Sequence, residues 1–291
     1  MNKIYFGLTM LSMLVGVTMT AQDNELSASY RQKFDRQVRN VGVTGVGVET
    51  IVSRWEEDCP DDPDMLVAKF DFNYAKSVSS GVVQRPTQRY LGEKPILTLK
   101  DSTGADVFYY QVAEFNDEYF SIALQSISRA VHLKPRELRY RFDKINALVA
   151  YEKDSPDMSY SEIKTLVSEY SSSKNDEWTL DSKPLAAGVD SRISPEFSQA
   201  MGEYCYALYK VGTPLAYDYF LQLSTMMNKL EPKNPVFIDN IGSYWQVAKK
   251  NNKKAEKYYK KALKIDPQDY AATTNLKIIQ SSKSQKGQSG K

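Results

Sequence analysis

The strongest constraint on the fold comes from the segment Asn234–Ile279, in which two short apolar stripes are separated by a turn. Over residues 238–248 apolar side chains recur every three or four positions, which is the period of one helix face. The second stripe consists of Ala255, Tyr258, Tyr259, Ala262 and Ile265. It stops at Asp266-Pro267, because proline cannot continue a helix. The pattern predicts two short antiparallel helices with small residues where they cross.

These residues resemble the tetratricopeptide repeat. Gly242 and Trp245 match the Gly-x-x-aromatic pattern of the family's first helix. The second-helix pattern, with steps of four, three and five, is matched by Ala255, Tyr259, Ala262 and Pro267. The chain departs from the family in a turn that is one residue longer and has Lys and Asn in place of Gly. The resemblance implies an all-α fold of antiparallel helix-hairpin repeats, a TPR-like α-solenoid whose first helices bind peptides.

The same apolar spacing before a proline recurs in three other places, ending at Pro60, Pro135 and Pro232. The interval from Pro232 to Pro267 is 35 residues, close to one repeat of the family. We therefore predict one helical repeat domain over residues 22–280. Its best repeat spans 234–267, and a further helix follows over 268–280.

Two stretches interrupt the helical pattern. Residues 79–112 are expected to form an inserted loop and a β-hairpin, because β-prone runs at Ile96–Leu99 and Val107–Tyr110 flank a polar turn with Gly. Residues 171–194 are also irregular. The polar tail 281–291 lacks aromatic residues and is expected to be disordered.

The N-terminus has the layout of a secretory signal peptide. A lysine precedes an apolar run from Ile4 to Val17, which is followed by small and polar residues up to Ala21. The run is shorter than the roughly 20 residues of a transmembrane helix. We expect cleavage after Ala21, so that residues 1–21 are removed and the protein is exported, periplasmic or secreted, and does not span the membrane. The alternative is an uncleaved N-terminal anchor helix.

Composition excludes several classes of protein. Apolar residues make up 42% of the 291 residues and charged residues 25%, which is typical of a folded soluble chain. The net charge of +2 gives no general attraction to nucleic acid, and an exported chain is not expected to bind it. After export, Cys59 and Cys205 could form a disulfide, or both could be small buried hydrophobic residues.

No residue pattern indicates catalysis, a cofactor or a metal. With two Cys and one His, the usual Cys/His zinc sites are excluded. The single His132 lies at a predicted helix end and lacks a nucleophile motif nearby. Gly42, Gly45 and Gly47 suggest a phosphate loop only superficially, because no Gly-Lys-Ser/Thr follows, and a helix–helix turn is favoured. We expect a non-catalytic protein without cofactor or metal.

Two clusters of charge lie far apart in the sequence. The acidic cluster consists of Glu56, Glu57, Asp58, Asp61, Asp62 and Asp64; the basic one consists of Lys249, Lys250, Lys253, Lys254, Lys257, Lys260, Lys261 and Lys264. The acids do not match an EF-hand loop. Solvated helix faces are the favoured interpretation; ion binding and head-to-tail pairing are the alternatives.

The expected function is that of an exported scaffold or adaptor that binds a protein or peptide on a helical-repeat surface. On the best repeat, the residues off the packing stripe are the candidates for partner binding: Asp239, Asn240, Ser243 and Gln246. The alternative is a binding module for a glycan or another cell-envelope ligand. That alternative would use Phe108, Tyr109 and Tyr110 of the hairpin as an aromatic platform.

Overall fold

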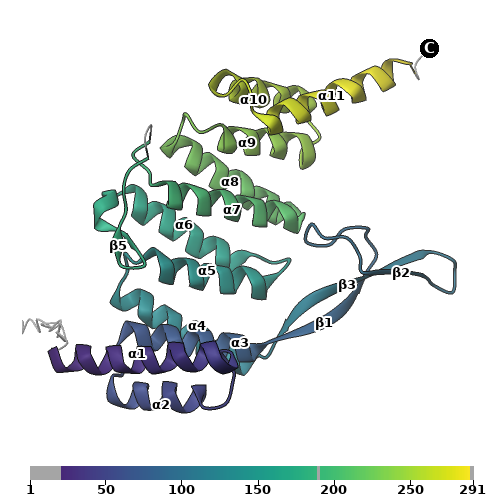
Figure 1. Cartoon of the computed structure of the whole chain (residues 1–291). Helices are drawn as coiled ribbons and strands as arrows, with labels where there is room; N and C mark the ends of the chain where they lie inside the picture. The colour runs from purple at the N-terminus through teal and green to yellow at the C-terminus, as the bar shows by residue number, and fades with distance from the viewer. Residues whose placement is uncertain (1–20, 189–190, 289–291) are drawn as a thin grey trace, which may run out of the picture.

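The computed structural model of the chain describes residues 21–188 and 191–288, so residues 1–20 of the predicted signal peptide lie outside it. In this part eleven α-helices form five antiparallel pairs that stack one upon the next, with a last helix at the end (Figure 1). The pairs are α1 (Ala21–Val41) with α2 (Val48–Asp58), α3 (Pro63–Ser77) with α4 (Asp117–Leu133), α5 (Leu138–Glu152) with α6 (Asp157–Ser171), α7 (Pro195–Val211) with α8 (Pro214–Leu230), and α9 (Pro235–Val247) with α10 (Asn252–Ile265). The predicted helical repeat fold is confirmed, and the best-matched repeat forms α9 and α10.

Short local signals fix where most of the helices begin. In α3, α7, α8 and α9 a proline occupies the first turn, directly after a capping side chain. The four caps are Asp62, Ser194, Thr213 and Asn234, and each accepts a hydrogen bond from a backbone N–H of its helix. The prolines that open α3, α7 and α9 mark the start of a new helix pair, whereas Pro214 opens the second helix of its pair.

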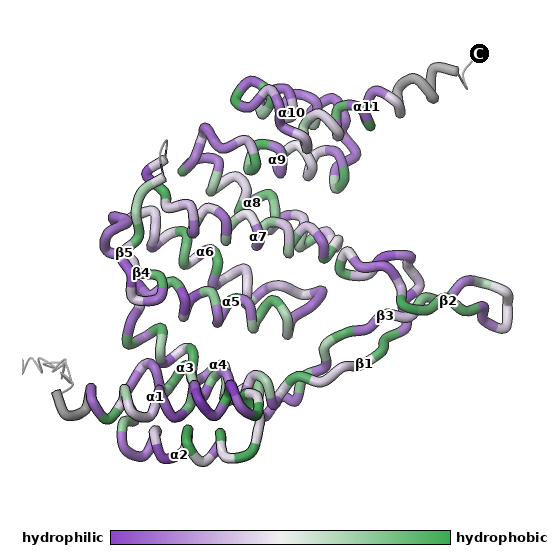
Figure 2. Tube along the Cα trace, viewed as in Figure 1, coloured by the Kyte–Doolittle hydropathy of each residue, from purple (hydrophilic) through white to green (hydrophobic). Residues whose placement is uncertain are grey.

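The helices pack through apolar sides that alternate with polar sides along the chain (Figure 2). Three buried clusters follow one another: one around Trp55, from α1 to α5; a central one around Phe197, from α5 to α9; and one around Tyr259, from α9 to α11 (Tyr270–Gln288). Each cluster is shared between neighbouring pairs, so each pair buries its apolar side against the next one. Cys59 and Cys205 are buried in different clusters, and in the described structure they form no disulfide.

The insertion between α3 and α4 contains a three-stranded antiparallel sheet, ordered β1-β3-β2. The predicted hairpin is present as β2 (Leu97–Lys100) and β3 (Asp106–Phe115). The sequence analysis missed β1 (Val78–Arg85), which pairs with β3 over its whole length. Ser and Gly give β1 a weak strand signal, and only its hydrogen bonds to distant residues of β3 make it a strand.

The sheet forms an arm that projects away from the stacked helices (Figure 1). Leu97 and Leu99 of β2 are 50% and 47% exposed, so this strand does not rest on the helices. The loop of residues 86–96 does return to the stack. A Cβ built on Gly92 would lie 2.8 Å from Cδ of Lys210 in α7, which places the loop against the end of that helix.

Two predicted irregular regions have more structure than the sequence indicated. Residues 171–194 contain a 3-10 turn (Asn175–Glu177) and the short strands β4 (Thr179–Leu180) and β5 (Lys183–Pro184), and they bury Trp178 in the central cluster. The prediction of a disordered tail from residue 281 is wrong up to Gln288, where α11 ends. The Ser281 and Ser282 hydroxyls donate to carbonyls one turn earlier, and no proline stops the helix. Residues 289–291 lie outside the described part.

Candidate functional site

The first helices of the pairs, α1, α3, α5, α7 and α9, present one common side to solvent, which we call the first-helix face. Four of them begin with a side-chain cap, so equivalent positions can be counted from that residue. Nine residues after the cap stand Asp71, Asn146, Glu203 and Ser243. Thirteen residues after it stand Ala75, Ala150, Ala207 and Val247. None of these eight is buried, so a polar row and an alanine row run across this face.

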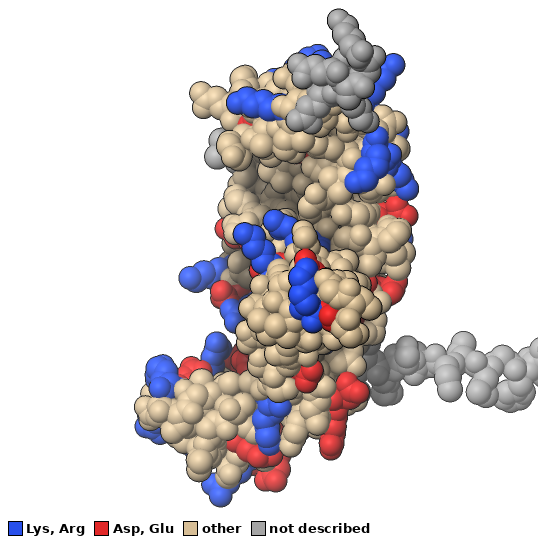
Figure 3. All heavy atoms as spheres, turned by 90° about the vertical axis from the view of Figure 1, so that its right-hand side faces the viewer, with Lys and Arg blue, Asp and Glu red and all other residues tan. Residues whose placement is uncertain are grey.

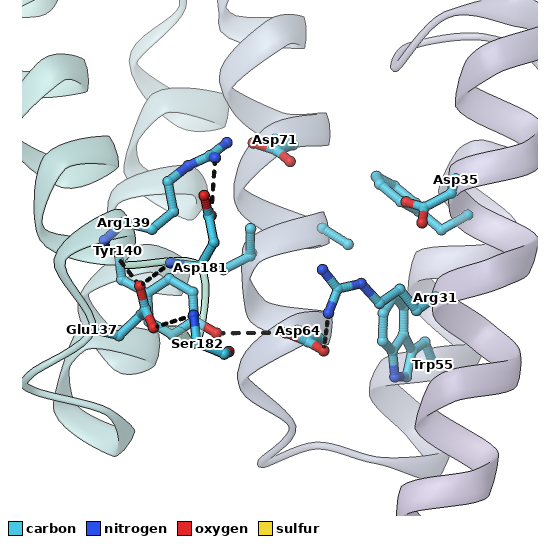
Figure 4. A pocket seen from close by; sticks show the side chains of 13 residues that line it. Arg31, Asp35, Trp55, Asp64, Asp71, Glu137, Arg139, Tyr140, Asp181 and Ser182 are labelled. Carbon is cyan, nitrogen blue, oxygen red and sulfur yellow. Dashed lines mark hydrogen bonds and ion pairs between the residues drawn. The ribbon is translucent and has the colours of Figure 1, made fainter. Parts of the chain in front are cut away.

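A pocket of about 400 Å³ opens on this face between α1, α3, α5 and the turn between β4 and β5 (Figure 4). We call it the acidic pocket, because its charged side chains are two arginines and five carboxylates: Arg31, Arg139, Asp35, Asp64, Asp71, Glu137 and Asp181. Phe34, Trp55 and Tyr140 add aromatic lining. The carboxylates outnumber the arginines, so the pocket carries a negative charge.

Part of this charge is neutralised inside the pocket. Arg31 of α1 reaches across to Asp64 of α3 with an N–O distance of 2.7 Å, and the Tyr140 hydroxyl donates to the other oxygen of Asp64 at 3.4 Å. Arg139 pairs with Asp143 one turn further along α5 and with Asp181. Asp64 is thus held from two sides, and Asp181 is held by Arg139.

Asp71 remains as the carboxylate open to a ligand. It comes from the polar row of α3, is half-buried, and makes no hydrogen bond or ion pair within the described residues. Burial raises the pKa of Asp71 to about 6; the nearby Asp143 raises this pKa further, and Arg139 opposes the shift. A cation placed beside it would relieve the cost of its buried charge. Asp35 of α1, exposed at the same pocket, adds a second acid.

The buried Glu137 holds one wall of the pocket in place. Its carboxylate caps α5 at the Arg139 N–H (3.2 Å) and accepts hydrogen bonds from the N–H groups of Asp181 (2.9 Å) and Ser182 (3.0 Å) and from the Thr179 hydroxyl (2.7 Å). Asp181 and Ser182 have positive φ, 51° and 63°, which is unfavourable for residues with a Cβ. The glutamate thus stabilises a strained turn beside Asp71.

The four candidates predicted on the best repeat lie within the packing of α9 more than on an open surface. Asp239 is only 5% exposed, and Asn240, Ser243 and Gln246 are half-buried. The Tyr259 hydroxyl donates to Gln246 Oε1 at 2.6 Å and lies 3.3 Å from the Ser243 hydroxyl. Only Ser243 belongs to the polar row. The prediction that they bind a partner stays a prediction.

Asp239 was predicted to lie off the packing stripe, and here the structure differs. Its carboxyl group faces Asp269 at the start of α11, and Oδ1 is buried without a hydrogen-bond partner among the described residues. Burial, with a hydrogen bond to Asp269, raises the pKa of Asp239 to about 8. The contact of α11 with α9, which the repeat pattern alone did not place, buries this residue.

The other residues considered in the sequence analysis lie at helix ends, in turns or in contacts between helices. His132 is exposed in the last turn of α4, and Gly42 to Gly47 form the turn between α1 and α2. Asp61 pairs with Arg129, Glu56 with Lys69, and the buried Asp62 accepts from the Trp55 indole N–H (2.8 Å) and the Ser27 hydroxyl, joining α1, α2 and α3. Phe108 and Tyr110 are buried and Tyr109 is half-buried, so the arm presents none of the three as an open aromatic surface.

Six of the eight lysines of the basic cluster lie on α10, and Lys249 and Lys250 lie in the turn before it. Five of the six are exposed on the side of α10 opposite Ala255, Tyr259 and Ala262: Lys253, Lys257, Lys260, Lys261 and Lys264. Figure 3 shows that the upper end, over the C-terminal helices, carries Lys and Arg with few acids, whereas over the middle and lower parts Lys and Arg are interspersed with Asp and Glu.

Sequence analysis missed the acidic pocket. Asp64, Asp71 and Arg139 lie on helices that are far apart in the chain, and only stacking brings them together. The signal that could have found them is the capping residue: counting from Asp62 and Glu137 places Asp64 and Arg139 at equivalent positions, two residues after each cap. Among the described helices none is long and apolar enough to cross a membrane.

Comparisons with known proteins give a loose structural likeness only. No family model matches the chain, and no curated protein matches it in sequence. A crystal structure of MamA protein superimposes with a TM-score of 0.43 at 11% identity, covering 84% of this chain and 93% of that one. MamA 41-end from Desulfovibrio magneticus RS-1 superimposes with a TM-score of 0.41 at 12% identity, covering 84% of this chain and 97% of the other. At these values no function is transferred to this chain.

Proposed function

We propose that the chain is an exported, non-catalytic scaffold of the tetratricopeptide-repeat kind that binds an extended segment of another protein on its first-helix face. The observation that carries the proposal is the acidic pocket, in which Asp71 and Asp35 offer two carboxylates without ion pairs on the part of the chain described here. A lysine or arginine side chain of the partner would supply the missing positive charge.

The chemistry of the pocket supports a peptide more than a small molecule or a sugar. Three different helices contribute charged groups to one open depression, and its aromatic residues are buried as lining instead of standing free for a sugar ring to stack on. A side chain that enters there leaves its backbone free to continue along the first-helix face. Charge-assisted hydrogen bonds to carboxylates would supply part of the affinity.

An array of random twelve-residue peptides, probed with the purified mature chain, tests this proposal. Peptides that bind should be enriched in Lys and Arg. The double variant Asp35→Asn/Asp71→Asn should no longer bind these basic peptides. The double variant Glu57→Gln/Asp176→Asn changes the net charge by the same amount at exposed sites away from the pocket, and it should still bind the basic peptides. If the bound peptides are not enriched in Lys or Arg, or if both variants lose peptide binding equally, the proposal is contradicted.

Export has its own test. When the full chain is expressed with a functional secretion system, mass spectrometry of the mature protein should find Gln22 at the N-terminus, since cleavage is expected after Ala21. A chain retained with Met1, or found only inside the cell, would contradict export and leave the peptide proposal to the array.

A further inference from the structure

A second pocket on the first-helix face is lined mainly by apolar groups, and its charged residues are Glu93, Lys153 and Lys210. It measures about 270 Å³ and lies between the C-terminal turns of α5 and α7, strand β3 and the loop of residues 86–96. Its walls include Val149 and Ala150 of α5, Ala207 and Val211 of α7, and Val112 and Ala113 of β3. An open apolar pocket of this kind is hydrated unfavourably until an apolar group fills it.

The space in this pocket comes from three alanines on three different elements. Ala113, Ala150 and Ala207 each place a single methyl group where a larger side chain would project inward. Ala150 and Ala207 are the members of the alanine row that face each other from neighbouring first helices. We call this depression the alanine pocket.

The inserted segment builds one side of the alanine pocket. The Tyr110 hydroxyl donates to the Thr87 carbonyl at 2.6 Å and the Tyr110 side chain is 1% exposed, which fixes the loop to the sheet. Two residues that line the pocket, Leu91 and Lys153, have φ of 50° and 54°, a backbone conformation that costs energy for residues with a Cβ. Both residues therefore adopt defined backbone conformations in the wall of the pocket.

One line of α5 connects the two pockets. Arg139 lines the acidic pocket and Ala150 lines the alanine pocket. Arg139, Asp143, Asn146 and Ala150 follow one another at helical spacing on the same side, and α5 has no exposed residues besides Arg139 and Asn146. At 1.5 Å per residue, the eleven residues from Arg139 to Ala150 extend roughly 16 Å along α5, which sets the scale of the distance between the two pockets. An extended peptide spans that distance with about five residues.

We infer that the alanine pocket takes a large aliphatic side chain of the same partner segment whose basic side chain enters the acidic pocket, about five residues away in extended conformation. This inference rests on the proposed function and names the chemistry of the partner: a Lys or Arg and a Leu, Ile or Met, with polar residues between them that pass Asp143 and Asn146. The inserted sheet then belongs to the binding site as the wall of its second half.

Fluorescence anisotropy with labelled synthetic peptides tests the spacing. Each peptide carries one Lys in a Ser/Thr/Gly background, has blocked ends, and carries one Leu placed from two to eight residues away on either side. Peptides with the Leu about five residues away should bind roughly tenfold tighter than the Leu-free peptide, as burial of one Leu side chain implies. In Ala150→Leu the gain should fall below twofold while dependence on the Lys remains.

Ala207→Leu repeats the test from the opposite wall, in case the first variant alters the fold. Ala271→Leu, on the exposed side of α11, is the matched control and should keep the gain.

If peptides bind through Lys but Leu adds nothing at any spacing, or if the gain survives both pocket variants, this inference is overturned and the proposed function stands. If no Lys-containing peptide binds, both fail. If decanoate binds in a way that both variants abolish while Leu adds nothing, the pocket is a lipid site and the inference is overturned.

Discussion

A Cβ placed on Gly242 would lie 2.6 Å from Cε1 of Tyr259, closer than any relaxed contact allows. The aromatic ring of α10 therefore packs directly on the glycine of α9 and fills the space that a side chain at that position would occupy. The Tyr259 ring cannot withdraw easily, because it is fully buried and its hydroxyl bonds to Gln246 at 2.6 Å. This contact is the physical basis of the repeat pattern recognised in the sequence.

Gly242→Ala should destabilise the protein, although alanine is the better helix former. The clash costs about 1–3 kcal/mol, and the gain in helix propensity is about 1 kcal/mol. Gly202 in α7 is the matched control: a Cβ there meets nothing within 4 Å, so Gly202→Ala should stabilise by up to about 1 kcal/mol. Urea denaturation of both variants measures the difference. Equal effects of the same sign would show that Gly242 is not packed as described.

Asp71→Asn should raise stability and weaken binding. The folded pKa of Asp71, about 6, lies above the ordinary aspartate value of 3.8, so the folded state holds the proton more tightly and stability falls as pH rises from about 4 to 6. The variant removes that fall, and above pH 6 it should be more stable by about 1–3 kcal/mol. Below pH 4 the two proteins should melt alike. Thermal denaturation from pH 3.5 to 8 measures this.

The same carboxylate predicts how peptide binding depends on pH. As Asp71 is protonated below pH 6, binding of a Lys-containing peptide should weaken between pH 7 and pH 5. The change should be smaller in Asp71→Asn, which has no charge to lose. Peptide titrations at both pH values compare the two proteins. An identical pH dependence of the affinity would show that Asp71 does not take part in peptide binding.

Asp239→Asn should extend stability to higher pH by a similar argument. The pKa of Asp239 is raised to about 8, so its protonated form is favoured by folding and stability is lost as pH rises from about 4 to 8. Asparagine stays neutral and can still donate to Asp269. Chemical denaturation at pH 5 and pH 9 should show a gain for the variant only at pH 9. A gain of equal size at pH 5 would contradict the assignment.

Glu137→Ala should destabilise the protein by about 2–3 kcal/mol, because two backbone N–H groups of a strained turn lose a buried charged acceptor. Glu137→Gln should recover part of the loss, since its amide oxygen can still accept. Glu177→Ala, which removes an exposed ion pair with Arg136, should cost less than about 1 kcal/mol. Melting temperatures rank the three variants, and an equal loss for Glu137→Ala and Glu177→Ala would be inconsistent with the anchoring role.

Dithiothreitol should leave the melting temperature unchanged, because Cys59 and Cys205 are buried in different clusters and are not linked. Burial raises the pKa of Cys205 to about 12, so this thiol stays unreactive in the folded protein. Ellman's reagent should detect both thiols only after denaturation. A fall in melting temperature on reduction would reveal a disulfide and contradict the structure.

The sequence by itself determined the local units of this protein. Several features depend only on contacts within about 35 residues, so a pattern along the chain predicts them. They are the helix starts at Asp62-Pro63, Ser194-Pro195 and Asn234-Pro235 and the repeat pattern from Gly242 to Pro267. The hairpin of β2 and β3 was predictable for the same reason. β1 and the helical residues 281–288 were not, because the strand depends on a partner distant in sequence and the last turns of α11 continue without a strong local signal.

Only the tertiary structure decided where a ligand can bind. Asp71 looks like any polar residue of a helix until α5 places Asp143 and Arg139 beside it and burial shifts its pKa. Ala150 and Ala207 look like ordinary helix formers until the inserted segment adds a wall and makes a pocket beside them. The physical reason is that backbone preference and helix periodicity act between near neighbours in the chain, whereas charge, burial and open space depend on what the stacking of separate units brings together.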